Sequence, residues 1–223
     1  SFNTMCSAAG INIMDAVIDN HTIKKLSLRG NLFDDSLAAM LGDLLRCNNV
    51  LEELDIGRNK LGFSCVFAIA ESLEVNRSLK RLYIDYNNFG GAGTATLDSF
   101  CRSVMMNYSL QILVFDGNKL GPTWGTRLAE TFARNNTLLQ VSLKDNRLDS
   151  KSGLALYKAY QHCPYLLELA LSADEIGQEL WEKFHLLFEV KRASTAPGEY
   201  IQETTLTIAQ TKIISSYTLL QES

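Results

Sequence analysis

The chain has 223 residues, of which 46% are hydrophobic, and its formal net charge is −4 at pH 7. A chain of this length and composition can bury a substantial core. The mildly acidic charge argues against nucleic acid as the partner. No apolar run of 18 residues is present, so we expect no transmembrane helix and no membrane partner.

One apolar pattern recurs six times between residues 23 and 176. In each copy, apolar residues stand at positions one, four and six, as Leu51, Leu54 and Ile56 do in the copy LEELDIGRNKLG. Positions four and six of a strand point to the same side, so each copy predicts a short strand. The copies begin 28, 28, 31, 28 and 28 residues apart and are Ile23–Leu32, Leu51–Leu61, Leu79–Phe89, Leu110–Leu120, Leu138–Leu148 and Leu166–Ile176.

Position nine is asparagine in five copies, whereas the sixth copy has Asp174 there. An asparagine amide at this point can hydrogen-bond backbone groups that the turn out of the strand leaves unpaired. We therefore expect a parallel sheet with a ladder of asparagines along one edge, formed by Asn31, Asn59, Asn87, Asn118 and Asn146.

The second half of each unit is predicted to be helical, because two apolar positions four residues apart define one helix face. The two positions stay in register when the three extra residues of the third unit are allowed for. The pairs are Leu41 and Leu45, Ile69 and Leu73, Phe100 and Val104, Leu128 and Phe132, Leu156 and Tyr160, and Phe184 and Phe188. A short polar group such as Asn76-Arg77-Ser78 then precedes the next strand.

These periods predict three segments. Residues 1–22 are expected to form an N-terminal half-repeat or capping helix, either a true cap or the cut end of a longer array. Residues 23–192 hold repeats one to six, with the last helix, at about Glu175–Lys191, acting as a cap. Residues 193–223 begin with a linker, are rich in Thr and Ser and fit no repeat, so we expect a C-terminal tail or a segment that covers the sheet edge.

Four positions carry local expectations. Ser36 and Ser64 each precede an apolar helical run and are predicted helix N-caps. The third unit holds the three extra residues and a glycine-rich turn from Gly90 to Gly93, which predicts an insertion in a surface loop. Trp124 follows Pro122 in the first turn of a predicted helix, and we expect its side chain to be half-buried against a neighbouring unit.

This pattern resembles that of the leucine-rich repeat family. Its 28-residue strand–helix unit is similar to the ribonuclease-inhibitor-like subclass, which includes ribonuclease inhibitor, the Ran GTPase-activating protein, tropomodulin and the repeats of NOD-like receptors. The resemblance covers roughly residues 8–192. It implies an α/β fold, a right-handed solenoid shaped as a horseshoe arc, with a parallel sheet on the concave face and helices on the convex face. These relatives share an architecture and not an activity.

Nothing in the sequence predicts catalysis. The five cysteines are odd in number and form no framework of close pairs, which is typical of free thiols in a reducing compartment: Cys6, Cys47, Cys65, Cys101 and Cys163. The three histidines have no fixed carboxylate or cysteine partner at metal-ligand spacing. The glycine-rich turn lacks the Lys and Ser/Thr of a phosphate-binding loop. We expect no enzyme activity, no metal, no cofactor and no small-molecule substrate.

The exposed strand positions three, five and seven offer a binding surface. At the sides of the sheet they alternate in charge between neighbouring strands, as in Lys25, Glu53 and Arg81. At the centre they are apolar, and large apolar anchors inside a polar rim are typical of protein interfaces. The predicted partner-binding residues are Tyr83, Ile112 and Val114, with Tyr86 at the strand end, and a rim of Arg81, Arg58, Asp85 and Asp116.

The leading functional hypothesis is a non-catalytic, intracellular protein-interaction module that binds a protein partner through its concave face, within a larger assembly. Two alternatives follow from the resemblance. One is a GTPase activator of the Ran type, whose strongly acidic tail and higher repeat number this chain lacks. The other is an actin-filament capping module like the tropomodulin C-terminal domain. We expect a cytoplasmic location, with association with the cytoskeleton or a nuclear location as alternatives.

Overall fold

A computed structural model describes residues 4–195 of the chain. Six strands of three residues form one parallel sheet, in which each strand pairs with the next in chain order. The strands are β1 (Lys25–Ser27), β2 (Glu53–Asp55), β3 (Arg81–Tyr83), β4 (Ile112–Val114), β5 (Gln140–Ser142) and β6 (Glu168–Ala170). The register follows the repeat position for position, so that Leu26, Leu54 and Leu82 are direct neighbours.

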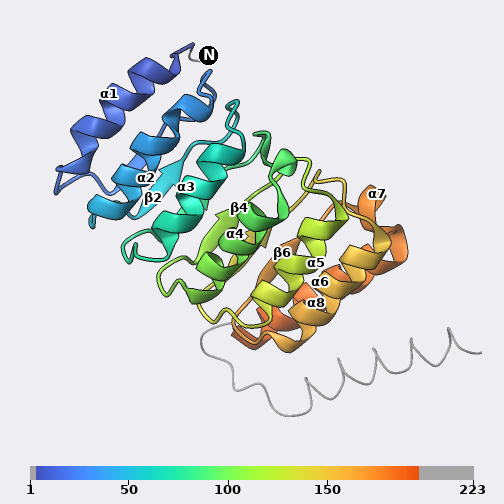
Figure 1. The fold of residues 1–223 in the computed structure, drawn as a ribbon. Helices are drawn as coiled ribbons and strands as arrows, with labels where there is room; N and C mark the ends of the chain where they lie inside the picture. The colour runs from blue at the N-terminus through green and yellow to red at the C-terminus, as the bar shows by residue number, and fades with distance from the viewer. Residues whose placement is uncertain (1–3, 196–223) are drawn as a thin grey trace, which may run out of the picture.

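Helices cover one face of this sheet and leave the other open (Figure 1). The α-helices are α1 (Ser7–Ile18), α2 (Ala38–Cys47), α3 (Phe63–Leu73), α4 (Thr94–Met106), α5 (Gly121–Phe132), α6 (Ser150–His162), α7 (Ala173–Ile176) and α8 (Gln178–Thr195). Two 3₁₀ turns, η1 (Asp35–Leu37) and η2 (Phe89–Gly91), follow β1 and β3. The axes of packed helices lie about 8–10 Å apart, whereas paired strands lie only about 4.8 Å apart. Because the helix layer is therefore wider than the sheet, the array curves with the sheet on its inner face.

This arrangement confirms the predicted architecture of about six strand–helix repeats. The apolar positions four and six of each copy point toward the helices, and Leu54, Ile56 and Leu82 are fully buried. The predicted helix positions are buried as well, from Leu41 in α2 to Phe184 in α8, except Phe188, which is half-buried. The core is one continuous apolar layer between sheet and helices, because each unit covers the face of its neighbour.

The predicted asparagine ladder is present at the carboxyl ends of the strands. Asn118 is fully buried, and its Nδ2 donates to the carbonyl oxygens of Ile84, one unit back (3.0 Å), and of Phe115 (3.1 Å). Its Oδ1 accepts the N–H of Asn87 at 3.1 Å. Each internal ladder residue thus joins two units, and the backbone groups of the turn are satisfied without water.

A second ladder lies at the opposite ends of the strands. Nδ2 of Asn48, Asn76, Asn107 and Asn135 donates to carbonyl oxygens of the preceding unit. Cys163 takes this position in the fifth unit, and Lys191 stands 28 residues later. The Lys191 ammonium group donates to the carbonyl oxygens of Cys163 and Leu166 and lies 4.5 Å from the Tyr160 ring centroid. Lys191 therefore closes the ladder from the terminal helix.

The irregular third and fourth units enclose an aromatic cluster. Phe115 packs on Phe89, Phe100 and Trp124, with ring centroids 5.6, 5.3 and 5.7 Å away. Trp124 is therefore buried, and the prediction of a half-buried side chain was wrong. The turn that begins at Gly90 packs on the next unit, because a Cβ on Gly90 would lie 1.8 Å from the carbonyl oxygen of Lys119.

The two predicted helix N-caps, Ser36 and Ser64, are wrong. Asp34 caps η1, and the Asp35 carboxylate accepts the N–H groups of Gly62 (2.7 Å) and Ser64 (3.2 Å) at the start of α3. The cap of α3 thus comes from the preceding unit.

The last helix also differs from the prediction of one helix at about Glu175–Lys191. Gly177, at φ 90°, divides it into α7 and α8. In place of Asp174, the neighbouring Glu175 accepts the N–H of Arg147. Residues 196–223, most of the predicted tail, lie outside the described residues.

Candidate interaction surface

The open face of the sheet is built from the alternate strand residues that point away from the helices. Parallel pairing places equivalent residues side by side, so this face carries rows that run across the strands. One row contains Lys25, Glu53, Arg81, Ile112, Gln140 and Glu168, and the next contains Ser27, Asp55, Tyr83, Val114, Ser142 and Ala170.

The side of the face over β1 to β3 is covered by mutually paired charges. Glu53 lies 3.2 Å from the Lys25 ammonium group and 3.5 Å from the Arg81 guanidinium group. Beside it, Glu52 lies 2.9 Å from Lys24 and 2.7 Å from Lys80, and these hydrogen bonds lower its pKa to about 2. Arg81, predicted to rim the patch, is thus engaged with a neighbouring strand.

Arg29 forms the most enclosed ion pair of this face. It crosses the middle strand to reach Asp85, two strands away, with Nη1 and Nη2 at 2.8 and 2.5 Å from the two carboxylate oxygens. Gly57 makes this possible, because a Cβ there would lie 2.4 Å from Arg29 Nη1 and 2.6 Å from Asp85 Oδ1. Asp85 is only 3% exposed. Contrary to expectation, this carboxylate is enclosed by an ion pair and does not lie on an exposed rim.

Tyr83, Ile112 and Val114 lie together at the centre of the open face, and we call them the central patch. Val114 is the direct neighbour of Tyr83, and Ile112 is the direct neighbour of Arg81. All three side chains are half-buried although no helix or strand of residues 4–195 covers them. Burial raises the pKa of the Tyr83 hydroxyl, which is therefore neutral at physiological pH. The structure brings these three predicted residues together as an apolar surface between polar strands.

A second group lies where the strands end, at position eight of the repeat. Tyr86 is 39% exposed, and its hydroxyl donates to Asp145 Oδ2 at 2.9 Å. The Arg58 guanidinium carbon lies 4.4 Å from the Tyr86 ring centroid, an attractive cation–π contact. The ring rests on Gly117, where a Cβ would come within 2.4 Å of it. We call Arg58, Tyr86 and Asp145 the strand-end row.

The backbone at position eight is left-handed in five successive units. Gly30 and Gly117 accept this conformation readily. Arg58, Tyr86 and Asp145, at φ 55°, 52° and 57°, adopt it at a cost of order 1 kcal/mol each. Their side-chain contacts offset part of this cost. Asp145 and Gly117 were not predicted from the sequence, although both stand in register with Tyr86 in the repeat.

Asp116 lies between the two groups. Its Oδ1 accepts the N–H of Lys144 at 2.8 Å, and the Ser142 hydroxyl donates to the same carboxylate. Burial raises the pKa of this carboxyl group. Of the four predicted rim residues, Arg58 and Arg81 remain at the surface, whereas both carboxylates are committed to contacts within the protein.

Comparison with known proteins agrees with this geometry. A model of the family described as Leucine Rich repeat matches residues 75–97, close to one unit of the array. The chain is 30% identical over 182 residues to NACHT, LRR and PYD domains-containing protein 4B of Mus musculus, and 28% identical over 134 residues to Protein TORNADO 1 of Arabidopsis thaliana.

The chain is a leucine-rich repeat protein. The first match covers 79% of this chain but only 20% of the mouse protein, and the second covers 57% of this chain and 10% of the Arabidopsis protein. The fold is also that of the solved structure titled Leiomodin-1 Actin-Binding Site 2, with a TM-score of 0.52, 13% identity, and coverage of 91% of this chain and 96% of that one.

The leucine-rich repeats hold no candidate metal centre: residues 4–195 bring no three histidine, cysteine or acidic side chains together as ligands. None of the helices in this range combines the length and apolar composition needed to cross a bilayer. Cys65 and Cys163 are buried, and burial raises the pKa of the Cys65 and Cys101 thiols, the latter to about 11. These two thiols are therefore protonated at neutral pH and are poor nucleophiles.

Proposed function

We propose that this leucine-rich repeat chain is a non-catalytic interaction module that binds a protein partner through the open face of its sheet. The observation that carries the proposal is the central patch. Charged neighbours on β1 to β3 satisfy one another, whereas Tyr83, Ile112 and Val114 have no side chain of the described residues across them. Desolvating such apolar side chains favours association, and polar neighbours around them exclude misplaced partners.

The strand-end row extends this surface. The Tyr86 ring is fixed between Arg58 and Asp145, so little conformational entropy is lost when a partner packs on it. Tyrosine and arginine are also the residue types that contribute most often to binding energy at protein interfaces. The proposed contact surface therefore runs from Val114 and Tyr83 to Tyr86 and Arg58.

The experiment is affinity capture from a native lysate with three forms of the chain. These are the unmodified protein, the double variant Tyr83→Ala/Val114→Asp, and the control Thr126→Asp on the exposed side of α5. All three are first matched in thermal unfolding. We expect one set of partners to be lost with the double variant and retained with the control. Capture of the same proteins by all three forms would contradict binding through the open face.

Two alternatives are tested separately. A GTPase activator of the Ran type would accelerate GTP hydrolysis by a purified GTPase. A tropomodulin-like module would slow elongation at actin pointed ends; the leiomodin likeness concerns the fold alone and does not favour actin. The 28-residue period supports membership of the ribonuclease-inhibitor-like subclass, and the arrangement of cysteines supports a reducing compartment.

A further inference from the structure

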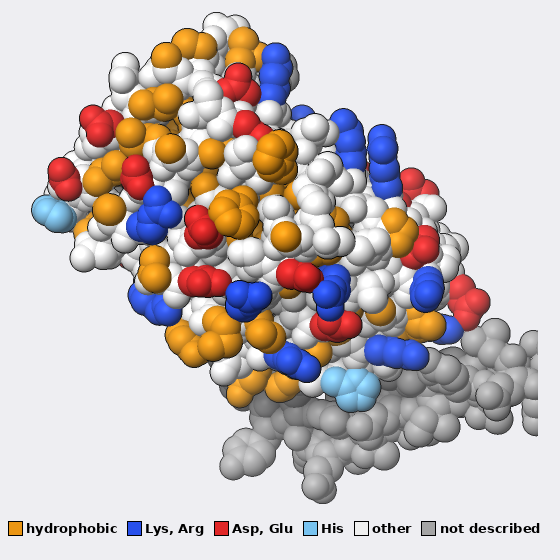
Figure 2. Space-filling model, viewed as in Figure 1, with side chains coloured by type: hydrophobic (Ala, Val, Ile, Leu, Met, Phe, Trp, Pro, Cys, Tyr) orange, Lys and Arg blue, Asp and Glu red, His pale blue; other side chains and the backbone are white. Residues whose placement is uncertain are grey.

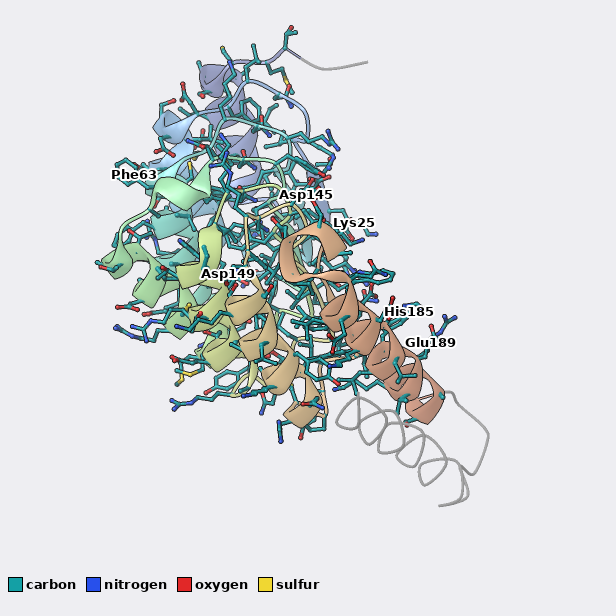
Figure 3. The ribbon with its side chains drawn as sticks, turned by 90° about the vertical axis from the view of Figure 1, so that its right-hand side faces the viewer. Lys25, Phe63, Asp145, Asp149, His185 and Glu189 are labelled. Atoms are coloured by element: carbon teal, nitrogen blue, oxygen red, sulfur yellow. The ribbon has the colours of Figure 1, made fainter. Side chains whose placement is uncertain are left out.

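The helix face of the array carries an exposed aromatic pair. Phe63 and Phe67 stand one turn apart on α3 and are 60% and 40% exposed. Phe63 points away from the side on which Lys25 marks the open sheet face (Figure 3). The positions equivalent to these two residues in the other five units hold Asp35 and Ala39, Thr94 and Asp98, Pro122 and Thr126, Ser150 and Leu154, and Gln178 and Glu182. Only the second unit has aromatic side chains at both positions, so the repeat itself does not require them.

A groove of about 400 Å³ runs beside this pair along α2 and α3. Phe63 and Phe67 line it together with small side chains, among them Ala38, Ala39 and Ala68, and with the charged residues Arg46 and Glu71. Small residues between two neighbouring helices allow a third helix to approach closely, with its side-chain ridge in the groove. The aromatic pair would then pack on the flank of that third helix.

The surroundings of the groove are acidic. The exposed residues of α1 to α3 and of the turns that end them include five carboxylates, Asp15, Asp19, Asp43, Glu71 and Glu74, against two guanidinium groups, Arg46 and Arg77. Arg77 donates to the backbone carbonyl oxygen of Glu74 at 2.8 Å. Arg46 is already paired with Asp43 at 2.7 Å. Figure 2 shows apolar and acidic side chains side by side over the N-terminal helices, with few basic side chains among them. This field attracts a basic partner and repels nucleic acid and anionic lipid.

We propose that the groove between α2 and α3 binds a basic amphipathic helix of a protein partner. The apolar stripe of that helix packs on Phe63 and Phe67, and its lysine and arginine side chains face the carboxylates of α1 to α3. Helix-in-groove recognition uses apolar anchors at i, i+4 and i+7, which lie about one turn apart along the bound helix. Phe63 and Phe67 are also one turn apart on α3, so the two spacings agree. The groove lies on the layer opposite the open sheet face, so this site is independent of the proposed function.

The test measures fluorescence anisotropy of a labelled synthetic 18-residue helix with leucine at i, i+4 and i+7 and lysine at its polar positions. We expect saturable binding that weakens at least tenfold in Phe63→Ser/Phe67→Ser and several-fold in Glu71→Gln/Glu74→Gln. The matched control is Leu154→Ser, because Leu154 is a 45% exposed apolar residue at the position of Phe67 in α6. Its affinity should equal that of the unmodified chain. Affinity should also fall between 50 and 500 mM NaCl.

Four outcomes would overturn the proposal. A scrambled peptide of the same composition that binds equally well would show attraction by charge alone. Sedimentation that reveals a dimer lost in Phe63→Ser/Phe67→Ser would make a second copy of this chain the occupant. Binding to vesicles of anionic lipid that depends on the same pair would assign the surface to a membrane. If the designed amphipathic peptide did not bind, the site would be refuted, whatever the result of the capture experiment on the open face.

Discussion

The asparagine ladder leads to a quantitative prediction for Asn118→Ala. The substitution removes the Nδ2 donor from the carbonyl oxygens of Ile84 and Phe115 and the Oδ1 acceptor from the N–H of Asn87. A hydrogen bond contributes about 1 kcal/mol net, and an orphaned buried donor costs about 1–3 kcal/mol. Because Asn118 is fully buried, bulk solvent does not reach the groups that lose their partner. We expect a loss of about 3–5 kcal/mol in the free energy of unfolding.

The matched control is Asn31→Ala at the first position of the same ladder. Nδ2 of Asn31 donates to the carbonyl oxygen of Leu28 at 2.8 Å, and its Oδ1 accepts the N–H of the half-buried Met5 at 3.2 Å. Asn31 therefore joins its own unit to a segment that water reaches, and we expect a loss of about 1–2 kcal/mol.

The assay is urea unfolding followed by circular dichroism for both variants. Because repeat arrays can unfold in more than one step, hydrogen exchange of the β3 and β4 amides should accompany it. Equal losses for Asn118→Ala and Asn31→Ala, or a loss below 1 kcal/mol for Asn118→Ala, would refute the view that the ladder stabilises the array through shared backbone contacts.

Three further predictions concern other parts of the array. Gly90→Ala should destabilise the chain by about 1–3 kcal/mol because its Cβ would meet the carbonyl oxygen of Lys119, whereas Gly91→Ala, with open space around it, should be neutral in the same urea assay. Lys191→Met should cost about 2 kcal/mol, since two terminal carbonyl oxygens lose a charged donor, and hydrogen exchange should rise first near β6. Glu52 has a folded pKa of about 2 against an ordinary 4.5, so its stabilising effect is complete above pH 4.5 and disappears as pH falls toward 2; urea midpoints of the unmodified chain and Glu52→Gln should therefore converge over this range.

The periodic part of this fold can be predicted from the sequence because each unit must meet the same structural requirements. Leu54 and Ile56 must be buried, the helix must cover them, and Asn59 must satisfy the turn, so one 28-residue period encodes strand, helix and ladder together. Lys191 was also within reach of this reasoning, because it stands one period after Cys163. It was missed because lysine is chemically unlike the asparagine that it replaces.

The features that escaped prediction are contacts between units with no repeated sequence signal. The Asp35 carboxylate caps a helix that begins 28 residues later, and no local pattern distinguishes it from Ser64, a residue type equally suited to capping. Arg29 reaches Asp85 only because Gly57 lies between them, so the pair depends on three units at once. The apolar centre of the candidate site was predictable, since it needs only the alternation of side chains along β3 and β4.

The two surfaces differ in why they are exposed, and this difference can be measured. The central patch belongs to the sheet, whose side chains alternate between core and open face, so Val114 is held in place by the pairing of β4. Phe63 belongs to the first turn of α3 and could be polar without harm to the core, as Thr94 and Ser150 are at the same position. Phe63→Ser should therefore leave stability within about 0.5 kcal/mol of the unmodified chain, the range of surface substitutions. In a chain that carries both Phe63→Ser and Val114→Asp, the change in the free energy of peptide binding should equal the sum of the changes in the two single variants. The two residues lie on opposite layers and share no partner, so we expect no coupling between them. Coupling between the two substitutions would mean that one ligand contacts both faces.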